Sequence, residues 1–382
     1  MHLPIDYETL RLIWWLFLGV LLIGFAIMDG FDLGVGMLLP VVARSDLERR
    51  VMLNAIGPVW DGNQVWLILG GGAVFAAFPT IYATAFSGFY LAMFLTLLAL
   101  ILRPVGFDFR NKLQDRRWRA VWDTGLFIAG FVPALVFGVA FGNLLQGVPF
   151  SFDADLRVTY DGGLLGLLNP FGLLAGLLSV AMLAMHGAAY LVVKTEGEIQ
   201  ARARRALRLA APAAIALFVV AGLWVAWGLD GYVIASAVDG AGPSNPLAKE
   251  VARVPGAWLD NYGRHPWMLA APLLGLGGAA LAWLLAAGRR ELPVFLATAA
   301  SVLGIVATAG VSLFPFLMPS SLEPKASLTV WDASSSQFTL FVMLIATVIF
   351  LPIVLLYTGF VFRVLRGKVT AGYVEKNSSS LY

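Results

Sequence analysis

A carboxylate and two carboxamides lie close together inside an apolar stretch of the chain. They are Asp61, Asn63 and Gln64, within the sequence VWDGNQVWLILGGG of residues 59–72. A charge at the middle of a membrane costs at least ~2.5 to 3.5 kcal/mol on insertion scales, so a carboxylate there favours a functional role. Because a carboxyl group can bind and release a proton, we interpret Asp61 as a candidate catalytic residue on a proton path. The alternative is a polar contact that holds neighbouring helices together.

The position of Asp61 on its helix decides which residues can share a path with it. If residues 53–76 form one continuous helix, Asp61 lies roughly 15 Å deep, close to the midplane of the membrane. At 100° per residue, Asn54, Asp61 and Gln64 fall within an arc of about 80°, and Asn63 points away from them. We therefore expect a polar stripe that opens toward the cytoplasm, with Asn54 and Gln64 lining the path.

Two further carboxylates lie near the end of the first apolar stretch, in the sequence MDGFDLGVG of residues 28–36. Asp29 and Asp32 are three residues apart, so they share one face of a helix. They could be interfacial carboxylates held by a basic partner such as Arg103, or the place where protons enter the membrane. The residue types alone leave both interpretations open.

Histidine and cysteine usage limits the cofactors that this chain can hold. The sequence has no cysteine, which excludes iron–sulfur clusters and thiolate chemistry. Of its three histidines only His186 lies inside an apolar stretch, so a haem with two histidine ligands cannot be built. His186 could be a single axial ligand, but a histidine bonded to a neighbouring helix is the favoured interpretation. We predict no metal site in this chain.

Tryptophans mark the expected ends of the membrane spans. Many of the 12 tryptophans lie near such ends, as in the aromatic belts of membrane proteins. Trp66 lies deeper in its stretch. It could line a path through the membrane, although packing in the core is the safer interpretation.

Composition shows what must position these residues. Hydrophobic residues make up 59% of the 382 residues and charged residues 13%, whereas soluble domains average about 45–50% and about 25%. A helix needs ~20 largely apolar residues to cross a bilayer. We predict an all-α polytopic protein, a single transmembrane domain over residues 1–382, with nine spans near residues 10–30, 53–76, 80–102, 121–145, 164–192, 208–229, 267–287, 292–317 and 332–362.

The distribution of basic residues predicts the orientation of these spans. Of the 26 lysines and arginines, 20 follow the odd-numbered spans, and positively charged loops stay on the cytoplasmic side. We therefore expect the N-terminus outside and the C-terminus inside. Because the basic residues are spread over five loops, they do not indicate nucleic-acid binding.

The sequence resembles subunit II of the cytochrome bd ubiquinol oxidases over essentially its whole length. The resemblance rests on long motifs that occur in order: GFAIMDGFDLGVG, WDGNQVWL, AFSGFYLA, RPVGFDFR, FGNLLQGVPF, LLNPFGLLAG, FPFLMPSS, SLTVWDASSSQFTL and NSSSLY. It implies two four-helix bundles plus a peripheral helix. It also implies a subunit of a respiratory enzyme in the bacterial cytoplasmic (inner) membrane that oxidises quinol and reduces dioxygen to water.

The resemblance further implies cofactors, partners and residue roles. Two haems b, one haem d and the quinol site are expected in the partner, subunit I, and a structural ubiquinone in this subunit. The heterodimer is expected to use ubiquinol or menaquinol, to contact membrane lipids and to admit small accessory subunits. Asp61 matches an aspartate thought to pass cytoplasmic protons toward the haems, and Trp66 matches a tryptophan proposed to border an oxygen channel.

Two other functions agree with the polar residues alone. A secondary transporter also holds carboxylates at the midplane, often in related halves, but no sequence repeat is visible. An inert structural scaffold, in which Asp61 only packs, is the second alternative. Substitution of Asp61 distinguishes the scaffold from a proton path.

Overall fold

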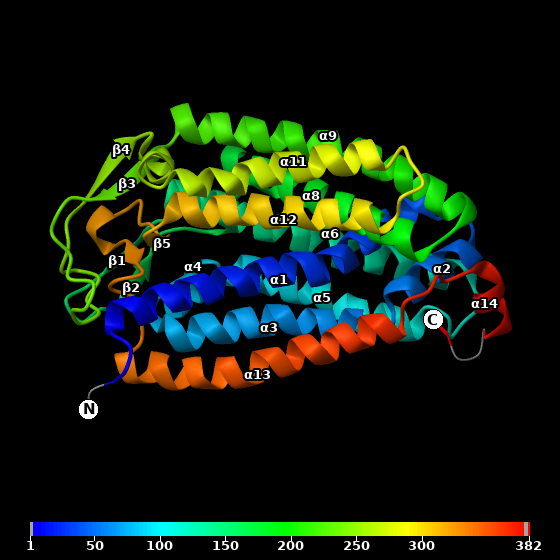
Figure 1. The fold of residues 1–382 in the computed structure, drawn as a ribbon, viewed down its shortest axis with the longest axis horizontal. Coiled ribbons are helices and arrows are strands. Elements are labelled where there is room, and N and C mark those ends of the chain that lie inside the picture. Colours follow the sequence, from blue (N-terminus) through cyan, green and yellow to red (C-terminus); the bar gives the residue numbers. More distant parts are fainter. Residues whose placement is uncertain (1–2, 378–380) are drawn as a thin grey trace.

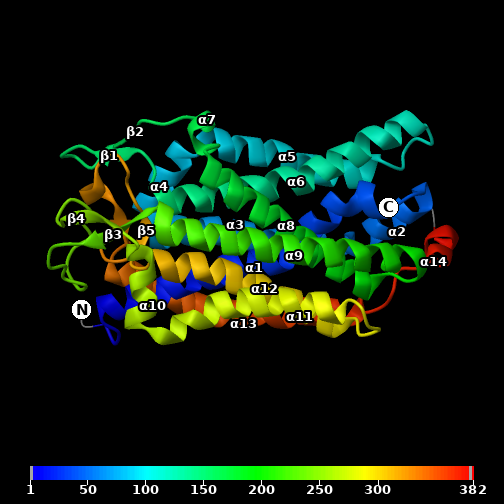
Figure 2. The ribbon, with the colours of Figure 1, turned by 90° about the horizontal axis from the view of Figure 1, so that it is seen from above.

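The computed structural model describes residues 3–377 and 381–382. Eight helices among these residues are long and apolar enough to cross a membrane. They run side by side along the long axis of the molecule (Figures 1 and 2). They are α1 Tyr7–Val42, α5 Tyr90–Phe109, α6 Arg116–Gln146, α8 Pro170–Lys194, α9 Gly197–Gly228, α11 Ala270–Leu285 with the preceding turn η2 Pro266–Leu269, α12 Leu292–Leu313 and α13 Gln337–Val364. The predicted all-α polytopic fold is confirmed.

The predicted span over residues 53–76 is wrong as one continuous helix. The chain forms α2 Asp46–Ile56, leaves helical geometry at Val59 (φ −124°), and begins α3 Trp60–Ala77. Pro58 has no N–H to donate to the carbonyl of Asn54, so the helical hydrogen-bond ladder is interrupted there. The depth of Asp61, counted along an unbroken helix, therefore does not hold. The predicted span over 80–102 is likewise divided, into α4 Pro79–Gly88 and α5.

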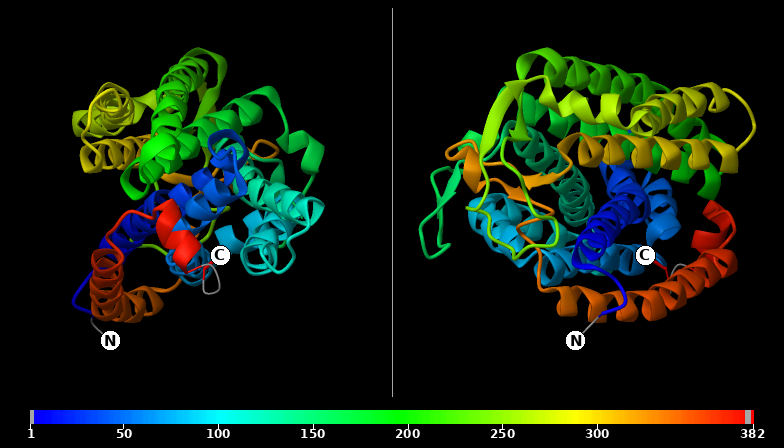
Figure 3. Two further views of the ribbon diagram at one scale, coloured as in Figure 1. Left: turned by 90° about the vertical axis from the view of Figure 1, so that its right-hand side faces the viewer. Right: turned by 60° about the vertical axis from the view of Figure 1, so that its left-hand side comes forward.

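The helices form two groups with one helix at the edge (Figure 3). One group contains α1, α3, α5 and α6, and the other contains α8, α9, α11 and α12. In the most apolar window of α13 only 6% of the residues are buried inside the chain, which makes α13 the peripheral helix. This arrangement agrees with the two bundles and peripheral helix implied by the resemblance.

Glycines bring α1 against its neighbours at the centre of the molecule. A Cβ on Gly34 of α1 would lie 2.1 Å from the carbonyl oxygen of Leu183 on α8. A Cβ on Gly130 of α6 would lie 2.4 Å from the carbonyl oxygen of Leu33 on α1. No side chain fits at such separations, so these two contacts require glycine. They let the backbone of α1 approach the backbones of α6 and α8 closely.

The two ends of the bundle differ in structure. At the end where α1 begins, three antiparallel hairpins connect the helices: β1 Phe150–Phe152 with β2 Val158–Tyr160, β3 Asp230–Ile234 with β4 Val251–Pro255, and β5 Phe316–Met318 with β6 Leu328–Thr329. The short helices α7 Leu164–Leu167 and α10 Asp260–Arg264, and the turns η1 Ala257–Leu259 and η3 Pro324–Ala326, belong to these connections. At the opposite end, α2 packs near α14 Ala371–Lys376. We call this second end the arginine-rich end, after Arg44, Arg49, Arg110, Arg116 and Arg119.

Buried charges tie the connections at the hairpin end together. Lys249 Nζ lies 2.7 Å from Asp332 Oδ2, and both side chains are buried. Burial lowers the pKa of Lys249, while the charge and hydrogen bond of Asp332 act against that shift. Arg11 of α1 is fully buried and donates to Ser334 Oγ and to the carbonyl oxygen of Gly240. These contacts fasten the long segment after β3 to α1 and to the segment that leads into α13.

α1 begins at one end of the bundle and α14 lies at the opposite end (Figure 1). Which end faces the cytoplasm stays a prediction from the basic residues. We expect a cysteine at position 155 to react with a membrane-impermeant maleimide on intact cells, and a cysteine at position 205 to react only after permeabilisation. Asp155 and Arg205 are both exposed, and the chain has no native cysteine to interfere. The opposite labelling pattern would reverse the orientation.

Candidate functional site

A buried ion pair joins α1 and α5. Arg103 Nη1 of α5 lies 2.5 Å from Asp29 Oδ1 of α1, and Arg103 Nη2 lies 3.4 Å from Asp29 Oδ2. Both side chains are almost completely inaccessible to solvent, at 4% and 0%. Arg103 lies seven residues, about 10 Å, along α5 from Arg110 at the arginine-rich end. The contact between Arg103 and Asp29 that the sequence suggested is present, and the choice between a structural contact and proton entry stays a prediction.

Asp32 lies one turn further along α1 and is the second carboxylate of the site. Its Oδ2 accepts a hydrogen bond of 2.8 Å from Asn63 Nδ2 on α3, and its side chain is buried. Its Oδ1 is buried without a hydrogen-bond partner among the described residues. The site therefore holds two buried carboxylates and one guanidinium, and only Asp29 has a direct counter-charge.

A water-sized cavity borders both Asp32 and Arg103. Its volume is about 10 Å³, and its remaining walls are Gly36, Leu53, Ile56, Phe107, Leu126 and Gly130. A cavity needs roughly 10–15 Å³ by this measure to hold one water molecule, and that water needs polar partners. Asp32 and Arg103 supply such partners, so the cavity matches the size and polarity that one hydrogen-bonded water needs.

Aromatic side chains cover the site on the side of α2. Trp60 stacks on Phe107 with ring centroids 5.3 Å apart, and the Arg103 guanidinium lies 5.9 Å from the centre of the Trp60 ring. The ring of Tyr382 packs edge-on against Phe107 at 5.0 Å. These contacts pack aromatic rings against Arg103 and against one another.

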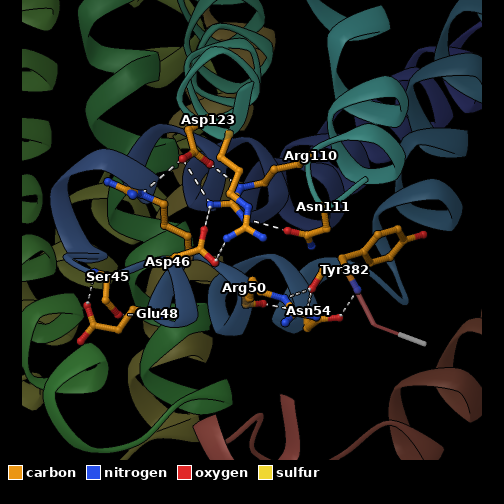
Figure 4. A network of polar contacts seen from close by, with 11 residues as sticks. Ser45, Asp46, Glu48, Arg50, Asn54, Arg110, Asn111, Asp123 and Tyr382 are labelled. Atoms are coloured by element: carbon orange, nitrogen blue, oxygen red, sulfur yellow. Dashed lines mark hydrogen bonds and ion pairs between the residues drawn. The ribbon is translucent and has the colours of Figure 1, made fainter. Parts of the chain in front are cut away.

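The backbone of Tyr382 is fastened to α2 (Figure 4). Asn54 Nδ2 donates to the Tyr382 carbonyl oxygen at 2.6 Å, and the Tyr382 N–H donates to Asn54 Oδ1 at 3.1 Å. Burial raises the pKa of the Tyr382 phenol, and the charges of Asp108 and Asp61 raise it further. Asp61 therefore lies in the electrostatic environment of Tyr382, at the start of α3.

The predicted polar stripe of Asn54, Asp61 and Gln64 is wrong. Asn54 belongs to α2, where Tyr382 occupies its carboxamide, and the break at Val59 separates it from α3. On α3, Asp61 is exposed, Gln64 is half-buried and Asn63 is buried. Asn63 does point away from Asp61, as predicted, but Asn63 is the residue that faces the interior. The amide that joins the site is thus the one that sequence reasoning left out.

Trp66 lies in the core next to α1. A Cβ on Gly24 would lie 2.6 Å from Trp66 Cε3, so the indole occupies the space that this glycine leaves free. Trp66 is buried within the same apolar cluster as Phe25 and Leu178. This position agrees with packing, and a role beside an oxygen path stays a prediction.

His186 has protein partners at both ring nitrogens. Nδ1 lies 2.9 Å from Thr298 Oγ1, and Nε2 lies 3.0 Å from the carbonyl oxygen of Ile27. The ring also stacks on Phe295 at 4.8 Å. The favoured interpretation, a histidine bonded to neighbouring helices, is confirmed. No cluster of three or more potential metal ligands occurs within residues 3–377 and 381–382.

If the chain is part of the haem-bearing complex that the resemblance implies, we expect His186→Gln to leave the haem content of that purified complex unchanged, because both ring nitrogens are already occupied by protein groups. The measurement is the haem spectrum per mole of complex after extraction into alkaline pyridine. Loss of one haem per complex in this variant would assign an iron ligand to this chain.

Phe107, Asn63 and Tyr382 are site residues that sequence reasoning missed. Asn63 could have been found from its polarity, since a carboxamide in an apolar stretch needs a hydrogen-bond partner. For Tyr382, 328 residues from Asn54, no local pattern reports the contact. In the sequence Phe107 resembles any aromatic residue of a helix core, so nothing marks it as a site residue.

Comparison with known proteins gives one consistent result. A family model described as cytochrome bd terminal oxidase subunit II matches residues 10–365. The chain is 53% identical over 378 residues to cytochrome bd-I ubiquinol oxidase subunit 2 of Escherichia coli (strain K12), covering 99% of this chain and 100% of that protein. It is 34% identical over 359 residues to cytochrome bd ubiquinol oxidase subunit 2 of Bacillus subtilis (strain 168), covering 93% and 96% of the two chains.

A solved structure shares the fold. The chain resembles a chain of the bd oxidase from Geobacillus thermodenitrificans with a TM-score of 0.70, covering 94% of this chain and 98% of that one. The two are 18% identical in sequence, so this likeness concerns the fold alone.

Proposed function

The chain belongs to the cytochrome bd terminal oxidase subunit II family, and we propose that within the oxidase it carries protons from the arginine-rich end toward the partner subunit. Membership makes it a multi-pass subunit of a quinol-oxidising enzyme complex in the bacterial inner membrane, together with a partner subunit I. We propose that Asp29, Asp32 and Asp61 carry the protons.

Oxygen reduction creates the need for such a path. Reducing dioxygen to water consumes protons, and a proton cannot cross apolar lipid without titratable groups or water. The haems b, the haem d and the quinol site belong, in this proposal, to subunit I. His186, with both ring nitrogens bonded to protein groups, supports that division. The structural ubiquinone of this subunit stays a prediction from the resemblance.

The observation that carries the proposal is the unpaired carboxylate oxygen of Asp32. Arg103 compensates the charge of Asp29, so an ionised Asp32 has no counter-charge of its own within hydrogen-bond distance. A proton on Asp32 makes the site neutral, and release of that proton leaves one uncompensated charge. Because the water-sized cavity borders Asp32, a water held there would exchange a proton with the Asp32 carboxyl group.

Asp61 extends the path to the surface of the chain. It lies in the same first turn of α3 as Asn63, but on the exposed side. Val65, Ile68 and Leu69 are also exposed on α3, so this side faces either lipid or protein. A carboxylate against lipid is costly, which favours protein as the covering surface. In this proposal Asp61 faces subunit I and passes protons onward to it.

The test of Asp61 is a substitution that retains its shape. We expect Asp61→Asn to lower quinol-driven oxygen consumption per haem about tenfold, since an amide cannot exchange a proton in turnover and partner groups or water replace it only in part. Asp155→Asn, the same change at an exposed carboxylate of the hairpin end, is the control and should keep the wild-type rate. Wild-type oxygen consumption in Asp61→Asn would remove this residue from the path.

If the chain is only a structural scaffold, substitutions in the buried site should not lower oxygen consumption. If Asp29 and Asp32 only hold helices together, substitutions that keep assembly intact should also keep turnover. The tight Arg103–Asp29 pair by itself agrees with a scaffold. The unpaired oxygen of Asp32 favours proton transfer, because a purely structural contact gains nothing from a buried polar atom without a partner.

A further inference from the structure

A second cavity lies at the arginine-rich end and shares no residue with the carboxylate site. Its volume is about 700 Å³, and it lies where α1 ends and where α2 and α6 begin. Six charged side chains line it, and we call them the charged wall: Arg44, Asp46, Arg49, Arg116, Arg119 and Asp123. These are four cations and two anions, so the wall carries an excess of positive charge.

The two anions of the wall are already paired (Figure 4). Arg110, fully buried behind the wall, places Nε 2.6 Å from Asp123 and Nη2 2.9 Å from Asp46. Burial alone lowers the pKa of Arg110, but the hydrogen bonds and charges of Asp123 and then Asp46 outweigh it and raise that pKa above its ordinary value. Arg119 Nη1 adds a contact of 2.8 Å to Asp46, and Arg49 Nε lies 3.5 Å from Asp123. The carboxylates therefore do not neutralise the rest of the wall.

The remaining arginine groups are free to bind an anion. Arg44 and Arg116 are exposed at the cavity, and neither forms an ion pair with the part of the chain that the structure describes. Arg119 Nε is buried and has no hydrogen-bond partner among those residues. Two exposed guanidinium groups and one unpaired buried donor thus point to an anionic ligand with several acceptor oxygens.

The helices that open into the cavity favour the same kind of ligand. Ser45, the N-cap of α2, and Arg116, the first residue of α6, both line it. The N-terminus of each helix carries partial positive charge, which favours phosphate groups nearby, and the capping carboxylates Glu48 at α2 and Asp115 at α6 offset part of that charge. The helix ends add to the charged wall but would not define a site without it.

Three further lining residues, with little polar surface, lie on α6. Ala120, Thr124 and Phe127 line the cavity at spacings of four and three residues, so they lie on one face of the helix. Ala120 and Thr124 are exposed, and Pro40 of α1 also lines the cavity. A largely apolar helix face next to the charged wall, at the end of a membrane bundle, fits a lipid. Its phosphate would lie at the charged wall and one acyl chain along α6.

We propose that this cavity binds the headgroup of an anionic glycerophospholipid. The phosphate lies among Arg44, Arg116 and Arg119, and one acyl chain follows the α6 face through Thr124 and Phe127. The lipid bridges α1, α2 and α6 beside the buried ion-pair network of Arg110. Free inorganic phosphate shares the headgroup chemistry but makes no use of the α6 face.

The experiment measures lipid binding to the purified two-subunit oxidase in detergent. The probes are short-chain phosphatidylglycerol, phosphatidylcholine of the same chain length, and inorganic phosphate. The variant is Arg44→Gln with Arg116→Gln, which removes the two cavity arginines that have no carboxylate partner. The matched control is Lys112→Gln with Arg117→Gln, two exposed basic residues of the same end that do not line the cavity. The haem spectrum of each variant reports whether the complex is assembled.

The proposal expects saturable binding of phosphatidylglycerol to the wild type and to the control. The cavity variant should bind it about tenfold or more weakly while keeping its haem spectrum, since each arginine near a headgroup adds about 1 kcal/mol. Equal affinity for phosphatidylcholine would overturn the proposal, because the arginines would then not select the lipid. Unchanged phosphatidylglycerol binding in the cavity variant would overturn it as well. Displacement of phosphatidylglycerol by inorganic phosphate at equal concentration would make free phosphate, and not lipid, the ligand.

Discussion

Replacing Arg103 by methionine is expected to remove most of the assembled oxidase from the membrane. The substitution leaves Asp29 and Asp32 buried together without their only close cation. Removing one partner of a buried pair costs about 3–5 kcal/mol, because the remaining charge keeps its desolvation penalty. The measurement is haem absorbance per milligram of membrane protein, followed by thermal unfolding of whatever complex can be purified.

Two further variants identify the cause of that loss. Arg103→Met combined with Asp29→Leu should recover much of the assembly, because an apolar pair of similar volume can replace a buried ion pair. Arg264→Met is the control: Arg264 pairs with Asp260 at 3.8 Å, with side chains 67% and 51% exposed, and such pairs contribute about 0–1 kcal/mol. Wild-type assembly of Arg103→Met alone would show that Arg103 is not needed to hold the carboxylates.

Replacing Asp32 by asparagine is expected to lower turnover about a hundredfold while the complex and its haems persist. The carboxamide keeps the size of the side chain and can still bond to Asn63. It cannot bind and release a proton, so the site loses the group that changes protonation. Asp32→Glu should recover part of the rate, because it restores a carboxyl group beside the same cavity. The measurement is quinol-driven oxygen consumption per haem.

The comparison for Asp32 is Asp155→Asn, which should keep the wild-type rate. If Asp32→Asn also keeps that rate, with full haem content, the site is structural and the scaffold interpretation is correct.

The buried carboxylates could be predicted because their signal is local. Asp29 and Asp32 are three residues apart on one helix, and helical geometry alone places them on one face. Their depth in an apolar stretch demands a partner, and Arg103 is a basic residue near the same side of the membrane. The contact at 2.5 Å is the expected solution to that demand.

The predicted stripe around Asp61 was wrong because the angular positions of its residues were counted along one unbroken helix. Pro58 signals an interruption, but the sequence does not say whether the chain continues in the same direction beyond a proline. In the structure a capping box of Ser45 and Glu48 starts α2 as a separate short helix. Tyr382 then occupies Asn54 on α2 through a contact between distant parts of the chain. Neither the new helix start nor this distant contact changes the hydrophobic pattern of residues 53–76.

The fold itself was largely predictable, since helices in a membrane must satisfy their own backbone hydrogen bonds. Eight helices within the described residues match predicted spans in order, although α5 covers only part of the stretch over 80–102. The hairpins at the end where α1 begins were not predicted. They lie outside the apolar spans, and strands as short as Phe150–Phe152 have too few residues to show an alternating pattern.

Proton uptake by the reduced enzyme tests the central claim most directly. The purified two-subunit oxidase, fully reduced by quinol, is mixed with oxygen in weakly buffered solution, and a pH-indicator dye follows protons taken from the medium while haem absorbance follows electron transfer. The account predicts that Asp32→Asn keeps the first oxidation of the haems but takes up protons at least about tenfold more slowly than the wild type. Proton uptake at the wild-type rate in an Asp32→Asn complex with full haem content would contradict it.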